Sequence, residues 1–169
     1  MRLLKNLNNM KKNLKFIHKT SYIHKNSKIG KNVKIWRYSS IHENCSIGDN
    51  SSIGQNVCIG PNVVIGKNCK IQNNVSIYDG VTIQDDVFLG PSCVFTNVKY
   101  PRSKINQKKK FVKTLLKKGC TIGANATIIC GIVISENSFV GAGSVVTKNV
   151  DKNCLVFGNP AKKIKKLNF

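Results

Sequence analysis

The sequence predicts an all-β fold: a parallel β-helix of about six coils, built from six-residue repeats, with one long loop ejected from it. Three observations predict it. A large apolar residue recurs at every sixth position, a small residue recurs four positions later, and Asn, Gly or Asp usually stands just before the small one. The apolar residues are Ile17, Ile23, Ile29, Ile35, Ile41, Ile47, Ile53, Ile59, Ile65, Ile71, Ile77, Ile83, Leu89 and Phe95, then Ile122, Ile128, Ile134, Val140 and Val146.

Each repeat reads as a short strand followed by a tight corner. We number the large apolar residue position 1, so the small residue is position 5 and both point inward. Position 4 carries Asn, Gly or Asp because these residues tolerate a left-handed backbone at low cost. Three strands complete a triangular coil of eighteen residues, and successive coils stack at roughly 4.8 Å, the spacing of paired strands. An α-helix, with its period of 3.6, cannot keep an apolar stripe at every sixth residue.

The repeat divides the chain into four parts. Residues 1–16 form an N-terminal extension in which Leu3, Leu7, Met10 and Leu14 have helical spacing; the alternatives are a frayed basic extension or a transit peptide. The β-helix is expected over residues 17–164. Residues 98–119 interrupt it as the ejected loop, and loops of this length are usually functional or disordered. Residues 165–169 form a C-terminal tail.

Composition excludes several classes of function. The net charge of +21 invites a nucleic-acid interpretation, but 25 of the 28 basic residues are Lys, whereas nucleic-acid grooves usually combine Arg with aromatic residues. The seven cysteines include no CxxC pair, so neither a disulfide framework nor a metal site is expected, and a reduced cytoplasmic setting is favoured. No apolar run approaches the ~20 residues of a membrane span. Four cysteines fall at the small inward position and are predicted to fill the core: Cys45, Cys69, Cys93 and Cys120.

One corner of the predicted coil gathers polar residues where the loop begins. Because eighteen residues return the chain to the same corner, Asp79 should lie about 5 Å below Asn97, beside Tyr78. Asn97 stands off the usual Asn position, so no backbone rule explains it. Asn56 and Asn74 share another corner column, where corner geometry alone is an equal explanation. Polar groups gathered where a loop leaves a rigid scaffold make a plausible site.

Several motifs identify a family. The repeat, together with three C-terminal motifs, resembles the left-handed β-helix acyltransferases that use acetyl-coenzyme A, which implies a left-handed parallel β-helix. Four central motifs are similar to the bacterial UDP-2-acetamido-3-amino-2,3-dideoxy-glucuronate N-acetyltransferases of O-antigen synthesis. The C-terminal motifs are residues 121–127 (TIGANAT), 139–148 (FVGAGSVVTK) and 157–162 (FGNPAK), and the central ones are 54–57 (GQNV), 72–80 (QNNVSIYDG), 90–98 (GPSCVFTNV) and 101–103 (PRS).

The resemblance implies a reaction and roles for named residues. A sugar amino group would attack the thioester of acetyl-coenzyme A, with Asn97 orienting the amine and Asp79 assisting. A backbone N–H near Gly141–Ala142 would polarise the thioester oxygen. Lysines would meet the coenzyme's phosphates, and Arg102 a sugar carboxylate. The implied substrate-binding residues are Asn56, Gln72, Asn73, Asn74, Tyr78 and Arg102, and the implied coenzyme-binding residues are Gly123, Ala124, Gly141, Ala142, Lys148, Asn159, Pro160 and Lys162. Family members are homotrimers with sites between the prisms.

The sequence also departs from that family, and alternatives stay open. The family's histidines beside the tryptophan are absent from residues 36–40 (WRYSS), and Gln107 and Lys110 stand where the loop usually has arginine and glutamate. A dTDP-3-amino-3,6-dideoxyhexose N-acetyltransferase is the second candidate, and a non-catalytic β-helix interaction protein the third. A γ-class carbonic anhydrase would need a zinc-binding histidine cluster, but the three histidines lie in the first repeats. An ice-binding solenoid would show a regular Thr face.

Overall fold

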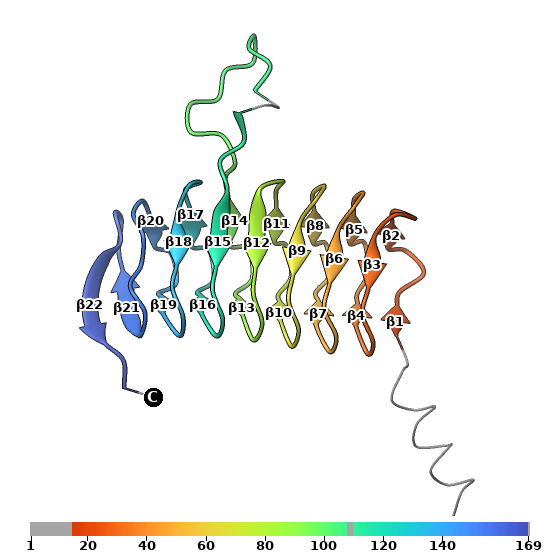
Figure 1. Ribbon diagram of the computed structural model, residues 1–169, viewed down its shortest axis with the longest axis horizontal. Helices are drawn as coiled ribbons and strands as arrows, with labels where there is room; N and C mark the ends of the chain where they lie inside the picture. The colour runs from red at the N-terminus through yellow and green to blue at the C-terminus, as the bar shows by residue number, and fades with distance from the viewer. Residues whose placement is uncertain (1–14, 108–109, 169) are drawn as a thin grey trace, which may run out of the picture.

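The computed structural model describes residues 15–107 and 110–168, and it shows a three-sided stack of coils (Figure 1). Strands eighteen residues apart pair in parallel, as in the register Ile17↔Ile35 and Ile35↔Ile53. The predicted all-β parallel solenoid is therefore confirmed, and its geometry is consistent with a left-handed β-helix. The predicted helix over residues 1–16 lies outside the described residues, except that Phe16 opens the first strand.

The described strands form three sheets, one on each side of the prism. Sheet A contains β1 (Phe16–Ile17), β4 (Lys34–Ile35), β7 (Ser52–Ile53), β10 (Lys70–Ile71), β13 (Phe88–Leu89), β16 (Thr121–Ile122), β19 (Phe139–Val140), β21 (Cys154–Phe157) and β22 (Lys162–Lys166). Sheet B contains β2 (Tyr22–Ile23), β5 (Ser40–Ile41), β8 (Cys58–Ile59), β11 (Ser76–Ile77), β14 (Val94–Phe95), β17 (Thr127–Ile128) and β20 (Val145–Val146). Sheet C contains β3 (Lys28–Ile29), β6 (Ser46–Ile47), β9 (Val64–Ile65), β12 (Val81–Ile83), β15 (Thr114–Leu116) and β18 (Val133–Ile134). We name the corners by the sheets they join: the A/B edge, the B/C edge and the C/A edge.

The corners follow the predicted backbone rule. The position-4 residues of most coils have φ near +60°, among them Asn44, Asn62 and Asn74. Some position-2 residues must be glycine for a different reason: successive coils approach so closely there that a Cβ has no room. A Cβ added to Gly48 would stand 2.5 Å from the backbone carbon of Gly66 in the next coil. Corner composition is therefore set by backbone geometry, and a corner residue outside the rule needs another explanation.

The core is one continuous column of inward side chains. Position 1 is fully buried from Ile35 onward, and the four predicted filler cysteines are 0–1% exposed. Burial raises the pKa of the Cys93 and Cys120 thiols to about 12, so both remain protonated. Each buried Ile or Leu contributes roughly 1.5–3 kcal/mol. The stack is thus a rigid support for whatever its edges carry.

The loop and the tail are shorter than the sequence predicted. Leu116 is fully buried, Gly119 has φ +71°, and β15 pairs with both β12 and β18, so residues 114–119 belong to the stack. Between β14 and β15 the chain protrudes from the stack (Figure 1), and the structure describes residues 96–107 and 110–113 of this connection. At the other end, β22 runs to Lys166 and pairs antiparallel with β21, so the first two residues of the tail predicted over 165–169 belong to a strand.

Candidate functional site

The B/C edge carries a pocket directly beneath the loop. Asp79 and Asn97 line it together, which confirms the predicted vertical neighbours. Its volume is about 420 Å³. The lining residues are Glu43, Pro61, Asn62, Tyr78, Asp79, Asn97 and Phe111.

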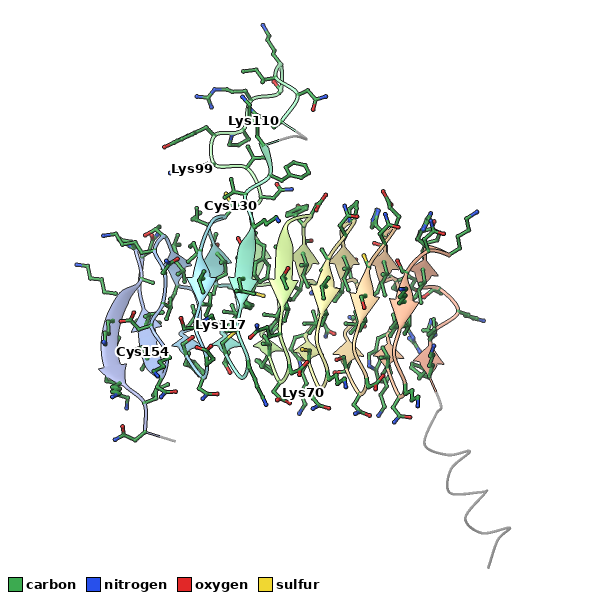
Figure 2. The ribbon with its side chains drawn as sticks, viewed as in Figure 1. Lys70, Lys99, Lys110, Lys117, Cys130 and Cys154 are labelled. Carbon is green, nitrogen blue, oxygen red and sulfur yellow. The ribbon has the colours of Figure 1, made fainter. Side chains whose placement is uncertain are left out.

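Two backbone hydrogen bonds hold the base of the loop over this pocket. The N–H of Val112 donates to the carbonyl of Asn97 at 2.9 Å, and the N–H of Thr114 donates to the carbonyl of Gly80 at 2.9 Å. Phe111, on the returning limb, therefore reaches the pocket wall. Lys99 and Lys110 lie farther out on the loop, while Cys130 lies at its base (Figure 2).

The pocket is acidic in a strongly basic protein. The chain has seven acidic residues against 28 basic ones. Two of the seven, Glu43 and Asp79, line this pocket, whereas no Lys or Arg does so among the described residues. The carboxylate of Asp79 accepts a hydrogen bond from Nδ2 of Asn62 at 3.2 Å. The described residues offer no partner to the Asn97 carboxamide, so the pocket presents an open amide beside carboxylates, which suits an amine.

The B/C edge continues from the acidic pocket to a basic one. Strand register places Cys130 and then Lys148 in the column of Asn97, so Lys148 lies two coils away, roughly 10 Å by strand spacing. Lys148 lines a second pocket of about 340 Å³ together with Pro160 and Lys162, so the structure brings these three predicted coenzyme-binding residues to one place. Asn159 is not among its lining residues. A pocket lined by Glu43 and Asp79 thus lies two coils from a pocket lined by three lysines and Asp151.

The turn that closes this second pocket is tied to the last strand of sheet B. The N–H of Ala161 donates to the carbonyl of Val145 at 2.8 Å, and the N–H of Gly158 donates to the Ser144 hydroxyl at 3.1 Å. The Asn159–Pro160 peptide is cis. The FGNPAK motif therefore folds back over β20, which brings Lys162 to the pocket.

The remaining predicted polar residues lie on a different edge. Asn56, Gln72, Asn73 and Asn74 follow strands of sheet A, so within one chain the structure does not bring them to Asn97. Asn56 donates to Asn74 at 3.0 Å, which supports the corner-geometry explanation for this pair. The backbone N–H of Gln55 donates to Oδ1 of Asn73 at 3.0 Å.

A pocket on the A/B edge adds two residues that the sequence reasoning missed. Trp36 and Gln55 line a hollow of about 280 Å³ together with Gln72 and Asn73. The Trp36 side chain is 48% exposed, and its ring lies 5.1 Å from that of Phe16. A half-exposed tryptophan at position 2, where many repeats have glycine, was the available signal.

The predicted glycines of the coenzyme site also follow sheet A. A Cβ on Gly123 would stand 2.5 Å from the backbone nitrogen of Ala142, so this glycine is needed for stacking. The N–H groups of Gly123 and Gly141 already donate to Val140 and Val156, both at 2.8 Å. Of the predicted oxyanion pair Gly141–Ala142, the Gly141 N–H is thus occupied, whereas the N–H of Ala142 has no backbone acceptor in the described chain. Ala124 occupies the equivalent place one coil earlier.

Arg102 does not lie in the acidic pocket. It is exposed on the loop, and its Nη1 donates to the carbonyl of Pro101 at 3.0 Å. Within residues 15–107 and 110–168, no group of three or more His, Cys, Asp or Glu residues could hold a metal ion. Over the same residues, no helix is long and apolar enough to cross a membrane.

Family comparisons match most of the repeat region. Residues 26–61 and 62–97 match the bacterial transferase hexapeptide (six repeats) family, and the second stretch contains both Asp79 and Asn97. Residues 44–79 and 118–148 match the hexapeptide repeat of succinyl-transferase. Together the matches extend on both sides of the loop.

Curated relatives are similar over shorter stretches. The dTDP-3-amino-3,6-dideoxy-alpha-D-galactopyranose 3-N-acetyltransferase of Aneurinibacillus thermoaerophilus is 48% identical over 54 residues, which are 32% of this chain and 28% of the relative. The galactoside O-acetyltransferase of Lactococcus lactis subsp. lactis is 31% identical over 85 residues, or 48% of this chain and 41% of the relative. The chain thus spans less than half the length of these relatives.

Solved structures match nearly the whole chain at low identity. WeeI from Acinetobacter baumannii AYE has a TM-score of 0.61 at 21% identity and covers 96% of this chain and 64% of its own. PerB from Caulobacter crescentus, in complex with CoA and GDP-perosamine, has a TM-score of 0.58 at 20% identity and covers 97% and 66%. At these identities the likeness shows the fold.

Proposed function

We propose that the chain, whose repeats match hexapeptide transferase families, is such a transferase and moves an acetyl group from acetyl-coenzyme A to the 3-amino group of a nucleotide-linked sugar. The observation that carries the proposal is the B/C edge, where an acidic pocket with an open carboxamide precedes a lysine-lined pocket. A sugar amine fits the first pocket, and the phosphates of coenzyme A fit the second. The relative from Aneurinibacillus thermoaerophilus is itself named for 3-N-acetyl transfer to a dTDP-linked sugar.

The chemistry is acyl transfer to a neutral amine. The amine lone pair forms the C–N bond, the C–S bond breaks, and the amine's surplus proton leaves with the coenzyme A thiolate. The carboxamide of Asn97 accepts a hydrogen bond from the amine and so orients the amine's lone pair. It only orients the amine, because an amide cannot act as a base at neutral pH. The carboxylate of Asp79 holds the same amine, so most of the rate enhancement comes from positioning.

The complete site is assembled from two chains of a homotrimer. The candidate residues divide between the B/C edge, with Asn97 and Lys148, and the A/B edge, with Gln72 and Ala142. Packing the B/C edge of one protomer against the A/B edge of its neighbour would unite them, and would let the Ala142 N–H polarise the thioester oxygen. Static light scattering on a sizing column tests the assembly: a stable, active monomer would contradict it.

Two sugars are candidates for the substrate. The motif resemblance favours UDP-2-acetamido-3-amino-2,3-dideoxy-glucuronate, whose carboxylate Arg102 would bind. The dTDP-3-amino-3,6-dideoxyhexoses are the second, favoured by the Aneurinibacillus relative and by the place of Arg102 outside the acidic pocket. Surface polysaccharide synthesis would use either product.

Mass spectrometry of the product decides the function and the sugar together. The purified protein is incubated with acetyl-coenzyme A and each UDP- or dTDP-linked 3-amino sugar, and free thiol is followed in parallel. We expect one acetyl group to be added to a 3-amino sugar and none to its 3-hydroxy analogue. Absence of acetylation and thiol release across the whole panel would favour a non-catalytic interaction protein instead.

A further inference from the structure

Asparagines at the corners form hydrogen-bonded ladders along the prism. Each has a left-handed backbone and donates its Nδ2 to the side-chain oxygen of the corner residue eighteen positions later. The ladder bonds between asparagines are Asn32 to Asn50 at 3.0 Å, Asn50 to Asn68 at 3.3 Å, Asn44 to Asn62 at 3.4 Å and Asn56 to Asn74 at 3.0 Å. Each amide accepts from one side and donates to the other, so a ladder fixes the orientation of its last member.

The ladder of the B/C edge ends on Asp79, and it does so out of register. Asn62 donates to Oδ2 of Asp79, seventeen residues later instead of eighteen. The residue at eighteen is Gly80, which has φ +94° and no side chain to accept the bond. A Cβ at Gly80 would stand 3.4 Å from the carbonyl oxygen of Val112 on the returning loop. That is an ordinary van der Waals distance, so the positive φ and not the space favours glycine here. Because Gly80 has no side chain, the ladder ends on the carboxylate of Asp79 in the pocket.

From this geometry we infer that Asn62 is a positioning residue for Asp79. Its Nδ2 fixes one carboxylate oxygen, while the other, Oδ1, has no partner among the described residues and remains for the amine. Asn62 also lines the pocket, so its effect is exerted where the amine binds. The inference rests on the proposed function, in which Asp79 holds that amine.

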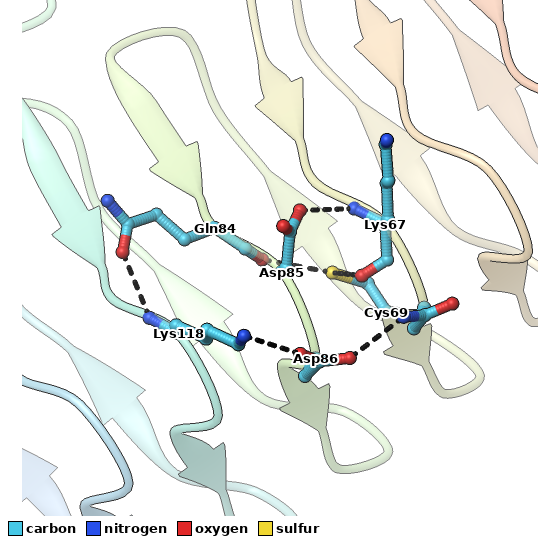
Figure 3. A network of polar contacts seen from close by, with 7 residues as sticks. Lys67, Cys69, Gln84, Asp85, Asp86 and Lys118 are labelled. Atoms are coloured by element: carbon cyan, nitrogen blue, oxygen red, sulfur yellow. Dashed lines mark hydrogen bonds and ion pairs between the residues drawn. The ribbon is translucent and has the colours of Figure 1, made fainter.

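The C/A edge offers a matched control. There Asn68 donates to Oδ1 of Asp86 at 2.9 Å, from a backbone with φ +58° against +59° for Asn62. Asp86, however, stands at the ordinary eighteen-residue position and also pairs with Lys118 at 3.6 Å (Figure 3). This carboxylate is committed to structural contacts and lies on another edge, so Asn68 should matter for stability alone.

A double-mutant cycle tests the inference. Asn62→Gly keeps the left-handed backbone accessible and removes the donor. It should lower kcat roughly tenfold or more with little change in the KM for acetyl-coenzyme A, because the fault is one of orientation. Asn62→Gly added to Asp79→Asn should lower kcat no further. Asn68→Gly should lower the melting temperature about as much as Asn62→Gly does, and it should leave kcat unchanged.

A readout that does not need activity completes the test. In side-chain carboxyl NMR spectra, Asn62→Gly should shift or broaden the Asp79 signal and leave that of Asp86 in place. The inference fails if the Asp79 signal does not move, if kcat stays within twofold, or if the two losses simply multiply. A wild-type protein that acetylates no amino sugar would refute the proposed function, and the NMR comparison would still decide whether Asn62 positions Asp79.

Discussion

Replacing Asn97 with alanine should separate activity from stability. The Asn97 side chain is half-buried and has no hydrogen-bond partner in the described chain. The hydrogen bond that anchors the loop uses the backbone carbonyl of Asn97, which alanine retains. We therefore expect the free energy of unfolding to change by no more than about 0.5 kcal/mol. Turnover should fall by roughly 10², about 2.7 kcal/mol of transition-state stabilisation, as when one preorganised polar group is lost.

Steady-state thiol release and thermal unfolding on the same preparations give both numbers. Glu136→Ala is the control, because Glu136 occupies the same corner position on the C/A edge and pairs with Lys117 at 3.1 Å. The control should keep full kcat. Full activity in Asn97→Ala would remove Asn97 from the site, and a loss of activity matched by a loss of several degrees in Tm would mean that its role is structural.

The remaining predictions concern the stack and its thiols. Gly48→Ala places a Cβ against the backbone of the next coil, and this overpacking should lower the free energy of unfolding by about 3 kcal/mol. Gly143→Ala, at φ +69° in open space, should lower it by only about 1 kcal/mol. Equal losses in urea titrations would contradict this. Iodoacetamide should alkylate the half-buried Cys58 in the native protein and spare Cys93 and Cys120, as peptide mass spectrometry would show. The pKa of these two core thiols is raised from 9.0 to about 12. Between pH 9 and 12 a thiol ionises in the unfolded chain but stays protonated in the folded one. The free energy of unfolding is therefore unaffected by these thiols below pH 9 and falls by about 1.4 kcal/mol per thiol per pH unit between 9 and 12. Alkaline unfolding curves of a Cys93→Ala and Cys120→Ala double variant should lack this loss.

The fold could be predicted from the sequence because one physical requirement repeats along the chain. Each coil needs a large inward residue, a small one and a left-handed corner, so Ile53 or Asn50 carries the same information as its counterparts. The same rule placed Asp79 below Asn97, since vertical neighbours follow directly from the period. The unit from Leu116 to Gly119 was missed because its outward positions are lysines, which merge with the lysine-rich loop before it.

The site was less predictable because function depends on which edge a residue occupies. Asn56 and Asn74 look like Asn97 in composition, yet they are ladder residues on another edge. The hydrogen bond from Asn62 reaches Asp79 because Gly80, at the regular ladder position, has no side chain, and the repeat rule treats Gly80 as an ordinary corner residue. Arg102 lies on a loop that has no period, so the sequence could not place it. A period fixes neighbours along the prism; it does not show what a loop covers.

A crystal structure with coenzyme A and a dTDP-linked 3-amino sugar would show whether the amine binds in the pocket beneath the loop. We expect the sugar amine within hydrogen-bond distance of Asn97 and Asp79 on the B/C edge, and the coenzyme phosphates beside Lys148 and Lys162 in the second pocket. Ligands bound along the C/A edge, or an amine far from Asn97, would contradict it.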